Sequence, residues 1–516
     1  MPAATAAPGA ALPHRALITA CAMLATLMQA LDGTIANVAL PYMQGGLAAS
    51  ADQVTWVLTS YITAAAIMTA PVGFLAARFG RKRLFLVSVG GFTLASVLCG
   101  AALSLEQMVL FRLLQGAFGA ALVPLSQSTM LDIYPPERRG SAMAIWGIGV
   151  MVGPILGPTL GGWLTNSWSW RWVFYVNLPF GILALLGLWA FLPAEDRGEA
   201  RRFDWLGFGV LSLGIGALQV MLDRGELKAW FGSTEILLEA ALAGLGLYLF
   251  VVHMLTAERP FIPPAIFRDR NFVGGLGVMF AVGAILFATA ALIAPYLQTL
   301  GDYPVFTAGL LMAPRGLGTM AALVIAGRLA DRVDPRGVML AGILILAWTL
   351  WEMTGWTPAV SQWTLATTTI LQGVGLGFVF NPLQVVAFAT LDPKLRTDGT
   401  ALISLVRNLG SAIGISAMAA LLTRSTQVAH ADLAAQVTPL NRLFGWPAIH
   451  RFWDPATPHG AAALNAEVTR QASIIAYGND FWLLMVLALG MLLLLPLMRR
   501  PAAARGAAGP GHAAME

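Results

Sequence analysis

The 516-residue sequence contains few charged residues, cysteines and histidines. Only 11% of its residues are charged and 57% are hydrophobic, which excludes a soluble globular protein because too little polar surface is available. Its two cysteines, Cys21 and Cys99, fall in separate apolar segments, so a disulfide framework and a cysteine metal site are excluded. The six histidines are scattered without the spacing of metal ligands. We therefore expect a membrane protein with no metal centre.

Long apolar runs account for most of the chain. A helix needs about 20 apolar residues to cross a bilayer. Runs of that length predict fourteen transmembrane helices, with the first apolar run too long for a cleaved signal peptide. They lie near residues 16–43, 54–77, 83–104, 107–131, 141–165, 173–193, 204–223, 235–256, 272–299, 305–329, 337–358, 363–390, 399–424 and 480–498. The fold class is thus all-α and polytopic.

Positive charges concentrate on one side of these spans. The tails and alternate connections hold most of the 31 lysines and arginines, whereas the short loops of the other side hold only Arg171, Arg224 and Lys228. Positive residues favour the cytoplasmic side of a membrane, so both termini are predicted to be cytoplasmic. This bias also explains the net charge of +5, and no nucleic-acid partner is needed.

One basic phrase occurs twice. Residues 73–82 read GFLAARFGRK and residues 327–336 read GRLADRVDPR, 254 positions later. A second echo, Leu-Gln-Gly followed by proline, begins at Leu114 and again at Leu371. Such repeats are typical of transporters built from two related halves. The offset is longer than six spans by about two spans, which predicts a 6+2+6 order of helices. The predicted parts are a tail at 1–15, a six-helix bundle at 16–195, a linker with two helices at 196–270, a six-helix bundle at 271–498 with an outer loop at 425–479, and a tail at 499–516.

These residues resemble the major facilitator superfamily, specifically its fourteen-helix drug:proton antiporters of the EmrB/QacA type. The resemblance covers nearly the whole chain. It is carried by Leu31–Pro41 in the first span, the loop phrase at 73–82, Arg112 with Gln115 and Gly116 in the fourth span, and the glycine and proline series of the fifth span. The EmrB branch is the most similar, on two stretches, Trp170–Pro179 and Leu222–Phe231. The resemblance implies proton-coupled drug efflux from the bacterial inner membrane by alternating access. It implies no bound cofactor, the proton motive force as the energy source, and a tripartite pump with a periplasmic adaptor protein and an outer-membrane channel.

Two charged residues lie deep in the predicted spans of the first bundle. Asp32 falls inside the first span and Arg112 inside the fourth. A charge near the bilayer centre costs several kcal/mol unless it is paired, hydrated or neutralised, so both should face the interior. Asp32 is our candidate proton carrier and Arg112 its fixed partner, since arginine does not lose its charge. The alternatives are that Asp32 braces neighbouring backbone and that Arg112 ties helices together.

A substrate pocket is expected near the midplane between the bundles. Candidate residues by position are Thr34, Asn37, Gln115, Asn381 and Gln384. Neighbouring aromatic and methionine side chains would suit an adaptable apolar pocket, but the sequence does not specify the substrate. Hydrophobic drugs are the first prediction. A metabolite, siderophore or lipid-like molecule exported by the same fold is the alternative.

Small residues recur along the fifth span. Gly149, Gly153, Gly157 and Gly161 are spaced by four, so they share one helical face, and Pro154 and Pro158 lie beside them. Another helix can approach such a face closely. In the resembled family this stripe takes part in gating. A packing face without that role is the alternative.

The repeated phrase supplies the other predicted gating residues. They are Gly73, Arg78, Gly80 and Arg81 in the first copy and Asp331 and Arg332 in the second. In the resembled family an acidic residue of the first copy holds the positive end of a helix in the opposite half. Here that position is Ala77, so we expect the lock to have passed to Asp331, facing Arg138 and Arg139.

Other function classes fit less well. A membrane-embedded enzyme needs clustered polar residues at an interface, and none appears, so no catalytic residue is predicted. A channel needs no duplicated cytoplasmic hinge. The outer loop at 425–479 is long for a transporter, and we expect it either to contact the adaptor or to cover the protein passively.

Overall fold

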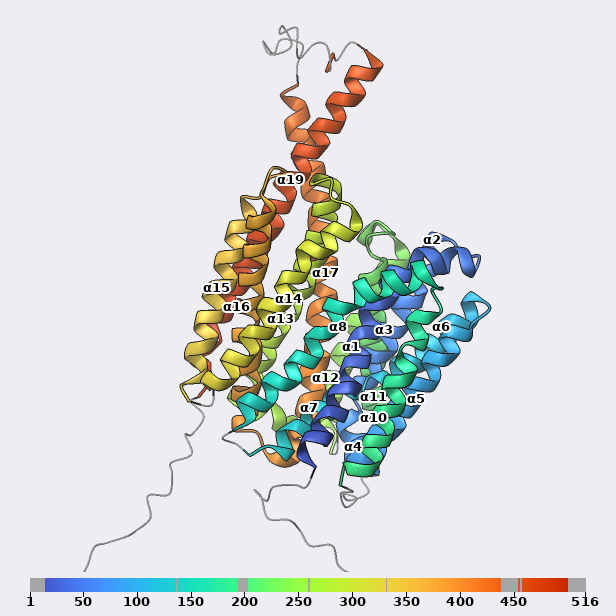
Figure 1. The fold of residues 1–516 in the computed structure, drawn as a ribbon, viewed down its shortest axis with the longest axis vertical. Coiled ribbons are helices and arrows are strands. Elements are labelled where there is room, and N and C mark those ends of the chain that lie inside the picture. The colour runs from blue at the N-terminus through green and yellow to red at the C-terminus, as the bar shows by residue number, and fades with distance from the viewer. Residues whose placement is uncertain are drawn as a thin grey trace, which may run out of the picture.

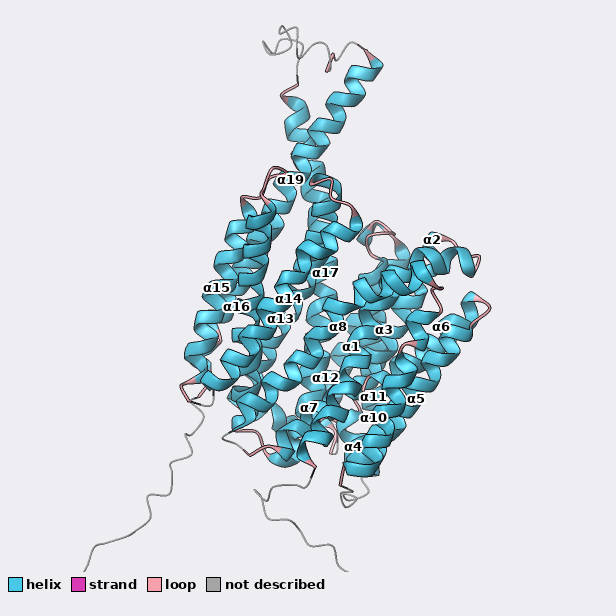
Figure 2. Ribbon diagram, in the orientation of Figure 1, coloured by secondary structure: helices cyan, strands magenta, loops and turns pink. Residues whose placement is uncertain are grey.

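The computed structural model describes residues 14–135, 138–193, 203–258, 260–330, 332–437, 453–454 and 457–499. Within these ranges the chain is helical, without strands (Figure 2). The start of α1 and the end of the described chain lie at one face, called here the terminal face. The last two long helices project from the opposite face, called here the hairpin face (Figure 1).

The N-terminal bundle contains six long helical segments, three of them broken. They are α1 (Arg15–Gly46), α3 (Trp56–Thr69) with α4 (Val72–Phe79), α5 (Arg81–Ala101), α6 (Leu105–Gly119) with α7 (Leu122–Ile133), α8 (Arg139–Ser167), and α9 (Trp172–Tyr175) with α10 (Asn177–Phe191), and a short α2 (Ala51–Val54) precedes α3. The α3 and α4 axes differ by 57°, at a break next to Pro71.

The linker and the C-terminal bundle follow in chain order. The linker helices are α11 (Trp205–Arg224) and α12 (Thr234–Thr256), with the short turns η2 (Trp230–Gly232) and η3 (Pro264–Arg268). The C-terminal bundle contains α13 (Arg270–Pro295) with the π-helical turn η4 (Tyr296–Leu300), α14 (Val305–Ala330), α15 (Pro335–Thr354), α16 (Gln362–Ala389), η5 (Pro393–Leu395), α17 (Arg396–Ala435), α19 (Pro458–Gly490), η7 (Met491–Leu493) and η8 (Leu495–Leu497).

The two bundles repeat the same helix pairings. In the first, α1 packs along α8, and α3 and α5 pack along α6. In the second, α13 packs along α17, and α14 and α15 pack along α16. Glycines allow the close approaches: Gly283 and Gly410, for example, lie directly against backbone of the facing helix. The internal repeat of the sequence is therefore also a repeat in space.

Short polar side chains begin many of these helices. Ser104, Asp204, Asp269, Ser361 and Thr457 each accept a hydrogen bond from a backbone N–H of the first turn. Such caps satisfy N–H groups that have no partner within the helix. Four of them cap helices where an apolar span starts, whereas Thr457 caps the part of α19 that extends beyond the bundle.

The polytopic all-α fold predicted from the sequence is confirmed. Within the described residues, twelve helices are long and apolar enough to cross a membrane, and the bent pair α3 and α4 raises this number to thirteen. α8 has 29 residues and occupies the fifth predicted span. The total of fourteen spans and the residue boundaries of the bundles, linker and tails stay predictions.

The segment predicted as an outer loop at 425–479 is helical over much of its length. α17 continues to Ala435 and α19 begins at Pro458, so both helices extend beyond the bundle as a hairpin (Figure 1). His430 Nε2 of α17 and Asn465 Oδ1 of α19 lie 3.0 Å apart, and their hydrogen bond joins the two helices. The described part of this connection is thus helical, in a segment rich in alanine, which favours a helix without any apolar run; its place on the outer side of the membrane stays a prediction.

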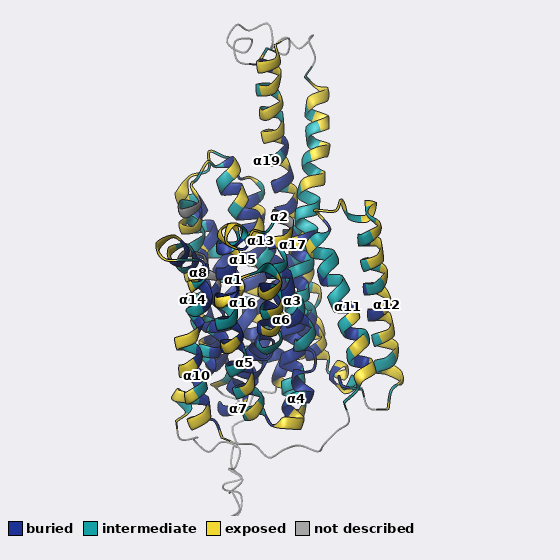
Figure 3. Ribbon diagram, turned by 90° about the vertical axis from the view of Figure 1, so that its right-hand side faces the viewer, coloured by how far each residue is buried: buried dark blue, intermediate teal, exposed yellow. Residues whose placement is uncertain are grey.

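The linker helices lie at the periphery. α11 and α12 pack against each other where Gly214 meets Gly246, and α12 stands on the outside of the molecule (Figure 3). On its other side α11 contacts the C-terminal bundle, where the Ser416 hydroxyl donates to the Leu222 carbonyl at 2.6 Å. The pair therefore flanks both bundles without separating them.

Candidate functional site

A buried ion pair lies inside the N-terminal bundle. Arg112 Nη1 of α6 donates to Asp32 Oδ2 of α1 at 2.7 Å. Both side chains are fully buried, with 0% exposure. The two charges predicted to face the interior thus face each other. Removing one partner of such a pair costs about 3–5 kcal/mol, because the other charge is left buried and uncompensated.

Two amides complete the surroundings of the Asp32 carboxylate. Gln115 Nε2 donates to Asp32 Oδ1 at 2.8 Å, and Asn177 Nδ2 of α10 donates to the same oxygen at 3.2 Å. Asn177 also donates to the Ser96 hydroxyl of α5 at 3.1 Å, which donates to the Phe174 carbonyl. One carboxylate therefore links α1, α6 and α10, and through Asn177 also α5.

Arg112 is held by three further groups. Its Nε donates to the Val57 carbonyl at 3.0 Å and its Nη1 also donates to Gln115 Oε1 at 2.9 Å. The guanidinium lies over the Tyr61 ring, 4.2 Å from its centre. Arg112 Nη2 and Asn177 Oδ1 have no partner among the described residues, so the network is not fully satisfied.

Sequence reasoning found part of this network. Asp32 and Arg112 were singled out because charges are rare in spans. Gln115 was assigned to the substrate pocket, and the structure places it beside Asp32 with no exposure. Asn177 and Ser96 were missed. The only signal for Asn177 was its place in the Trp170–Pro179 phrase, which served to identify the family.

The other predicted substrate residues lie in two places. Asn37 is exposed on α1, on the same helical face as the exposed Gly33, while the partly buried Thr34 donates to the Gly153 carbonyl of α8 at 3.1 Å. Asn381 and Gln384 are buried where the bundles meet. The geometry brings Thr34 and Asn37 together on α1 and places the other pair apart from them. Their contact with substrate stays a prediction.

The bundles are joined by hydrogen bonds near the terminal face. Gln127 of α7 donates to Gln384 of α16 at 2.6 Å, and Thr400 of α17 donates to the Pro124 carbonyl at 3.1 Å. Asn381 donates to the Gly140 carbonyl of α8 at 3.2 Å. We call this contact the seam. It closes the space between the bundles on the terminal side.

The first copy of the repeated phrase packs against the seam. Arg81 donates to Asp132 at 2.5 Å, and Asp132 accepts from Arg396 of the other bundle at 2.7 Å. Gly73 lies directly against Asp398 near the start of α17, where no side chain would fit. Gly80, with φ 86°, forms the turn between α4 and α5, a conformation suited to glycine.

The remaining gating predictions have mixed outcomes. Arg78 and Arg332 are exposed on the terminal side, and Asp331 lies outside the described residues. In the structure Asp132 and Asp398, neither of which was predicted, are the acidic residues at the first copy. The expectation that Asp331 is the lock stays a prediction.

The glycine stripe of α8 makes the close approach that its spacing predicts. A Cβ at Gly153 would lie 2.6 Å from Ala30 Cβ, and a Cβ at Gly161 would lie 2.8 Å from Ile35 Cγ1. Gly157 lies against Thr34. At Gly149 the nearest atom would be Met23 Cε at 3.5 Å, an ordinary contact. The side chains of Pro154 and Pro158 lie outside the described residues.

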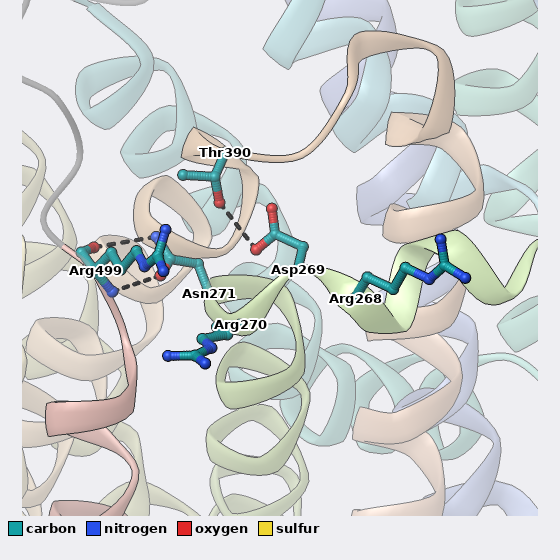
Figure 4. A pocket seen from close by; sticks show the side chains of 6 residues that line it. All are labelled: Arg268, Asp269, Arg270, Asn271, Thr390 and Arg499. Atoms are coloured by element: carbon teal, nitrogen blue, oxygen red, sulfur yellow. Dashed lines mark hydrogen bonds between the residues drawn. The ribbon is translucent and has the colours of Figure 1, made fainter.

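Two of the surface cavities formed by the described residues lie away from the Asp32 network. One, of about 210 Å³, lies at the terminal face, where Asp269 accepts a hydrogen bond from Thr390 and Asn271 bonds to the Arg499 backbone (Figure 4). The other, of about 320 Å³, lies near the hairpin and is lined by Thr299, Thr426 and Tyr477 among others. No group of three metal-ligating side chains occurs in the part of the chain that the structure describes.

The model of one protein family matches nearly the whole chain. The Major Facilitator Superfamily model matches residues 22–415 and 275–511. The chain belongs to the major facilitator superfamily. The repeated pairings of the two bundles and the seam between them are therefore the two-bundle architecture of this superfamily.

Within the superfamily the chain groups with EmrB-type drug exporters. It is 35% identical over 493 residues to the multidrug export protein EmrB of Haemophilus influenzae, covering 94% of this chain and 96% of the relative. The EmrB of Escherichia coli K12 is 34% identical over 96% of this chain and 98% of its own. The fatty acid resistance protein FarB of Neisseria gonorrhoeae is 35% identical, and the match covers 92% of this chain and 93% of FarB. The chain is thus a multi-pass membrane transporter of the multidrug-efflux type.

Solved superfamily structures share the fold at low sequence identity. The human organic anion transporter MFSD10 (TETRAN) superposes with a TM-score of 0.57 at 15% identity, covering 92% of this chain and all of its own. The proton:xylose symporter XylE superposes with the same TM-score at 16% identity. The superposition covers 93% of this chain and 95% of XylE. These similarities concern the fold alone.

Proposed function

We propose that this protein exports lipophilic small molecules in exchange for protons, by alternating access of a site between the bundles. The observation that carries the proposal is the buried Asp32–Arg112 pair. A carboxylate in the membrane interior is a natural proton acceptor, and a permanent cation beside it makes its charge sensitive to the surroundings. The terminal face is then cytoplasmic, in the inner membrane of a bacterium, since that side is rich in arginine.

Proton binding to Asp32 would loosen α1. The neutral carboxyl group no longer attracts Arg112, so the link between α1 and α6 weakens. α1 packs on the α8 glycine stripe, and α8 packs on α14 of the other bundle. A shift of α1 can therefore pass to the seam, whose opening would expose Asn381 and Gln384 to the cytoplasmic side while the opposite side closes.

Substrate and proton would compete through this network. Asn37 and Thr34 lie on the same helix as Asp32, within two turns, so a bound substrate on the exposed face of α1 changes the surroundings of the carboxylate. Release of the proton when substrate binds is the signature of such an exchange.

The test is substrate-dependent proton release from purified protein in weak buffer with a pH indicator. Asp32→Asn should abolish release, because an amide cannot carry the proton. Asp480→Asn is the matched control: Asp480 is equally buried, at 0% exposure, but lies in α19 away from the network. The double variant with Arg112→Gln removes the isolated cation, so it should fold yet still release no proton.

Two outcomes would overturn the proposal. Full proton release from the double variant would place the carrier elsewhere. Transport by wild type that is independent of a pH gradient across proteoliposomes, with substrate still exported, would remove proton coupling altogether.

We further propose that the hairpin docks a periplasmic adaptor protein that leads to an outer-membrane channel. The α17 and α19 extensions present largely exposed faces on the predicted periplasmic side (Figure 3). Replacing residues 431–462 by a short flexible loop should abolish co-purification of a co-expressed adaptor. Asp432→Asn, which keeps the helices, is the control. Unchanged co-purification after the replacement would leave the hairpin as a passive cover.

A second candidate is export of one metabolite, siderophore or lipid-like molecule. The similarity to a relative named for fatty acid resistance favours this candidate over other dedicated exporters. A panel of unrelated drugs separates the two functions: proton release with several drugs supports multidrug exchange, and a response to a single compound class supports the dedicated exporter.

A further inference from the structure

The cavity at the terminal face has an excess of positive charge. Its volume is about 210 Å³, and it lies where α13 begins and the described chain ends (Figure 4). Its lining consists of Arg268, Arg270, Arg499, Asp269, Asn271 and Thr390. The three arginines are exposed, and their three positive charges with one negative charge give the lining a formal charge of +2. A small hollow with this charge favours an anion.

The buried Asn271 holds two of these arginines at the cavity. Its side chain is 1% exposed, its Nδ2 donates to the Arg499 carbonyl at 3.1 Å, and its Oδ1 accepts from the Arg499 N–H at 2.6 Å. Arg270, the preceding residue, begins α13. The two arginines therefore come from adjacent segments. Their side chains lie on the same side of Asp269, whereas Arg268 extends to the other side (Figure 4).

The single acidic residue of the cavity is occupied by the helix that it caps. Asp269 Oδ1 accepts from the Phe272 N–H at 3.0 Å and from the Thr390 hydroxyl at 2.9 Å. These contacts hold the carboxylate at the start of α13, where it offsets the partial positive charge of the helix end. The charge of the arginines is not offset in the same way, because Asp269 forms no ion pair among the described residues.

Arg270 and Arg499 also have no ion-pair partner in the part of the chain that the structure describes. The seam shows the contrast, since Arg81 and Arg396 at the same face share the carboxylate of Asp132. A single exposed arginine is ordinarily solvated. Two that line one small cavity can instead donate to different oxygens of one phosphate group, in charge-assisted hydrogen bonds.

An exposed apolar surface continues from this cavity along the bundle. Val273 follows Arg270 by three residues, so the two share one face of α13, and Val273 is exposed. Gly277, one turn further along that face, lies against the Leu494 side chain of the last segment. Leu497 of the same segment is exposed, two residues before the end of the described chain. A soluble anion needs no such surface, whereas the acyl chains of a lipid do.

We propose that this cavity binds the phosphate group of an anionic phospholipid from the leaflet at the terminal face. Basic pockets between transmembrane helices at a membrane surface suit such head groups. Arg270 and Arg499 donate to the phosphate oxygens, and the acyl chains lie along Val273 and Leu497. The bound lipid ties the start of α13 to the end of the last segment. The inference needs only the position of the cavity at the membrane surface, so it does not depend on drug export or proton coupling.

The test is native mass spectrometry of the full-length protein in detergent, titrated with dioleoylphosphatidylglycerol or dioleoylphosphatidylcholine. The two lipids share their acyl chains and differ in net charge. Wild type should bind the phosphatidylglycerol more tightly. Arg270→Gln and Arg499→Gln should each weaken its binding roughly fivefold, the equivalent of about 1 kcal/mol per arginine, and leave phosphatidylcholine binding unchanged. Arg328→Gln, an exposed arginine in the last turn of α14, is the matched control and should change neither affinity.

Two further measurements keep the test independent of how the glutamine variants fold. Arg270→Lys and Arg499→Lys keep the charge and should retain the preference for phosphatidylglycerol. Higher salt should weaken phosphatidylglycerol binding to wild type more than phosphatidylcholine binding. Equal affinity of wild type for the two lipids would overturn the inference, as would a folded double glutamine variant with full phosphatidylglycerol affinity. Displacement of the lipid by an equal concentration of glycerol phosphate would show that the cavity takes a soluble phosphate, and the lipid assignment would be wrong.

Discussion

Replacement of Gly153 by alanine tests whether the contact between α1 and α8 holds the observed conformation. The added Cβ would lie 2.6 Å from Ala30 Cβ and 2.7 Å from the Ala30 carbonyl oxygen. Carbon atoms pack at about 3.5–4.0 Å, so α8 must withdraw by about 1 Å. The nearest atoms belong to backbone and to a methyl group, neither of which can rotate away.

The magnitude follows from two opposing terms. Overpacking costs about 1–3 kcal/mol, whereas alanine gains about 0.8–1 kcal/mol over glycine within a helix. The net expectation for Gly153→Ala is therefore a loss of roughly 0–2 kcal/mol. Gly149→Ala, one turn away on the same stripe, meets only Met23 at 3.5 Å and should keep the full gain. The difference between the two variants, about 1–3 kcal/mol, is the quantity to measure.

The assay is thermal unfolding of both variants in one detergent, followed by transport in proteoliposomes. Gly153→Ala should unfold at a lower temperature than Gly149→Ala and should transport more slowly. Equal unfolding temperatures would refute the reasoning, since the helices would then have room to spare. Unequal stability with equal transport would show a packing face without a role in gating.

Three further expectations concern the seam and the C-terminal bundle. Asp132→Asn removes the carboxylate that bridges Arg81 and Arg396. Labelling of a cysteine introduced by Thr400→Cys, with the reagent added from the terminal side, should then rise a few-fold. Unchanged labelling would show that the bridge does not hold the seam closed. Asn381→Ala removes the hydrogen bonds that its amide donates to the Gly140 and Leu323 helix carbonyls, at about 0.5–1.5 kcal/mol each. It should raise the same labelling while lowering the unfolding temperature; a stable, unlabelled variant would contradict this. Asp480→Leu removes a buried carboxyl group with no partner in the described chain and should raise the unfolding temperature, whereas a large loss would reveal a partner that this conformation does not show.

The sequence predicts well whatever depends on one helix at a time. Apolar length gave the spans, and glycine spacing gave the face of α8 that meets α1. Asp32 and Arg112 were found because a charge inside a span is costly wherever it lies. Each of these inferences needs only the period of a helix and the cost of burial.

Features that depend on which helices meet were not predicted. Asn177 belongs to the Asp32 network only because α10 lies beside α1 and α5, and no periodicity reveals that. Asn381 and Gln384 lie in the seam in this conformation, and only the packing of the two bundles reveals that contact; their role in substrate binding stays a prediction. The helical conformation of the outer connection was not predicted, because hydropathy detects apolar helices and not polar ones.

The length of α17 has a mechanical consequence. Its 40 residues form one unbroken helix of about 60 Å, from Arg396 at the seam to the hairpin. A stiff rod of this length converts a rotation at one end into a displacement at the other: a tilt of about 10° about its seam end moves the hairpin by roughly 10 Å. Opening of the seam would therefore displace the hairpin outside the membrane. A partner bound to the hairpin would in turn resist that opening.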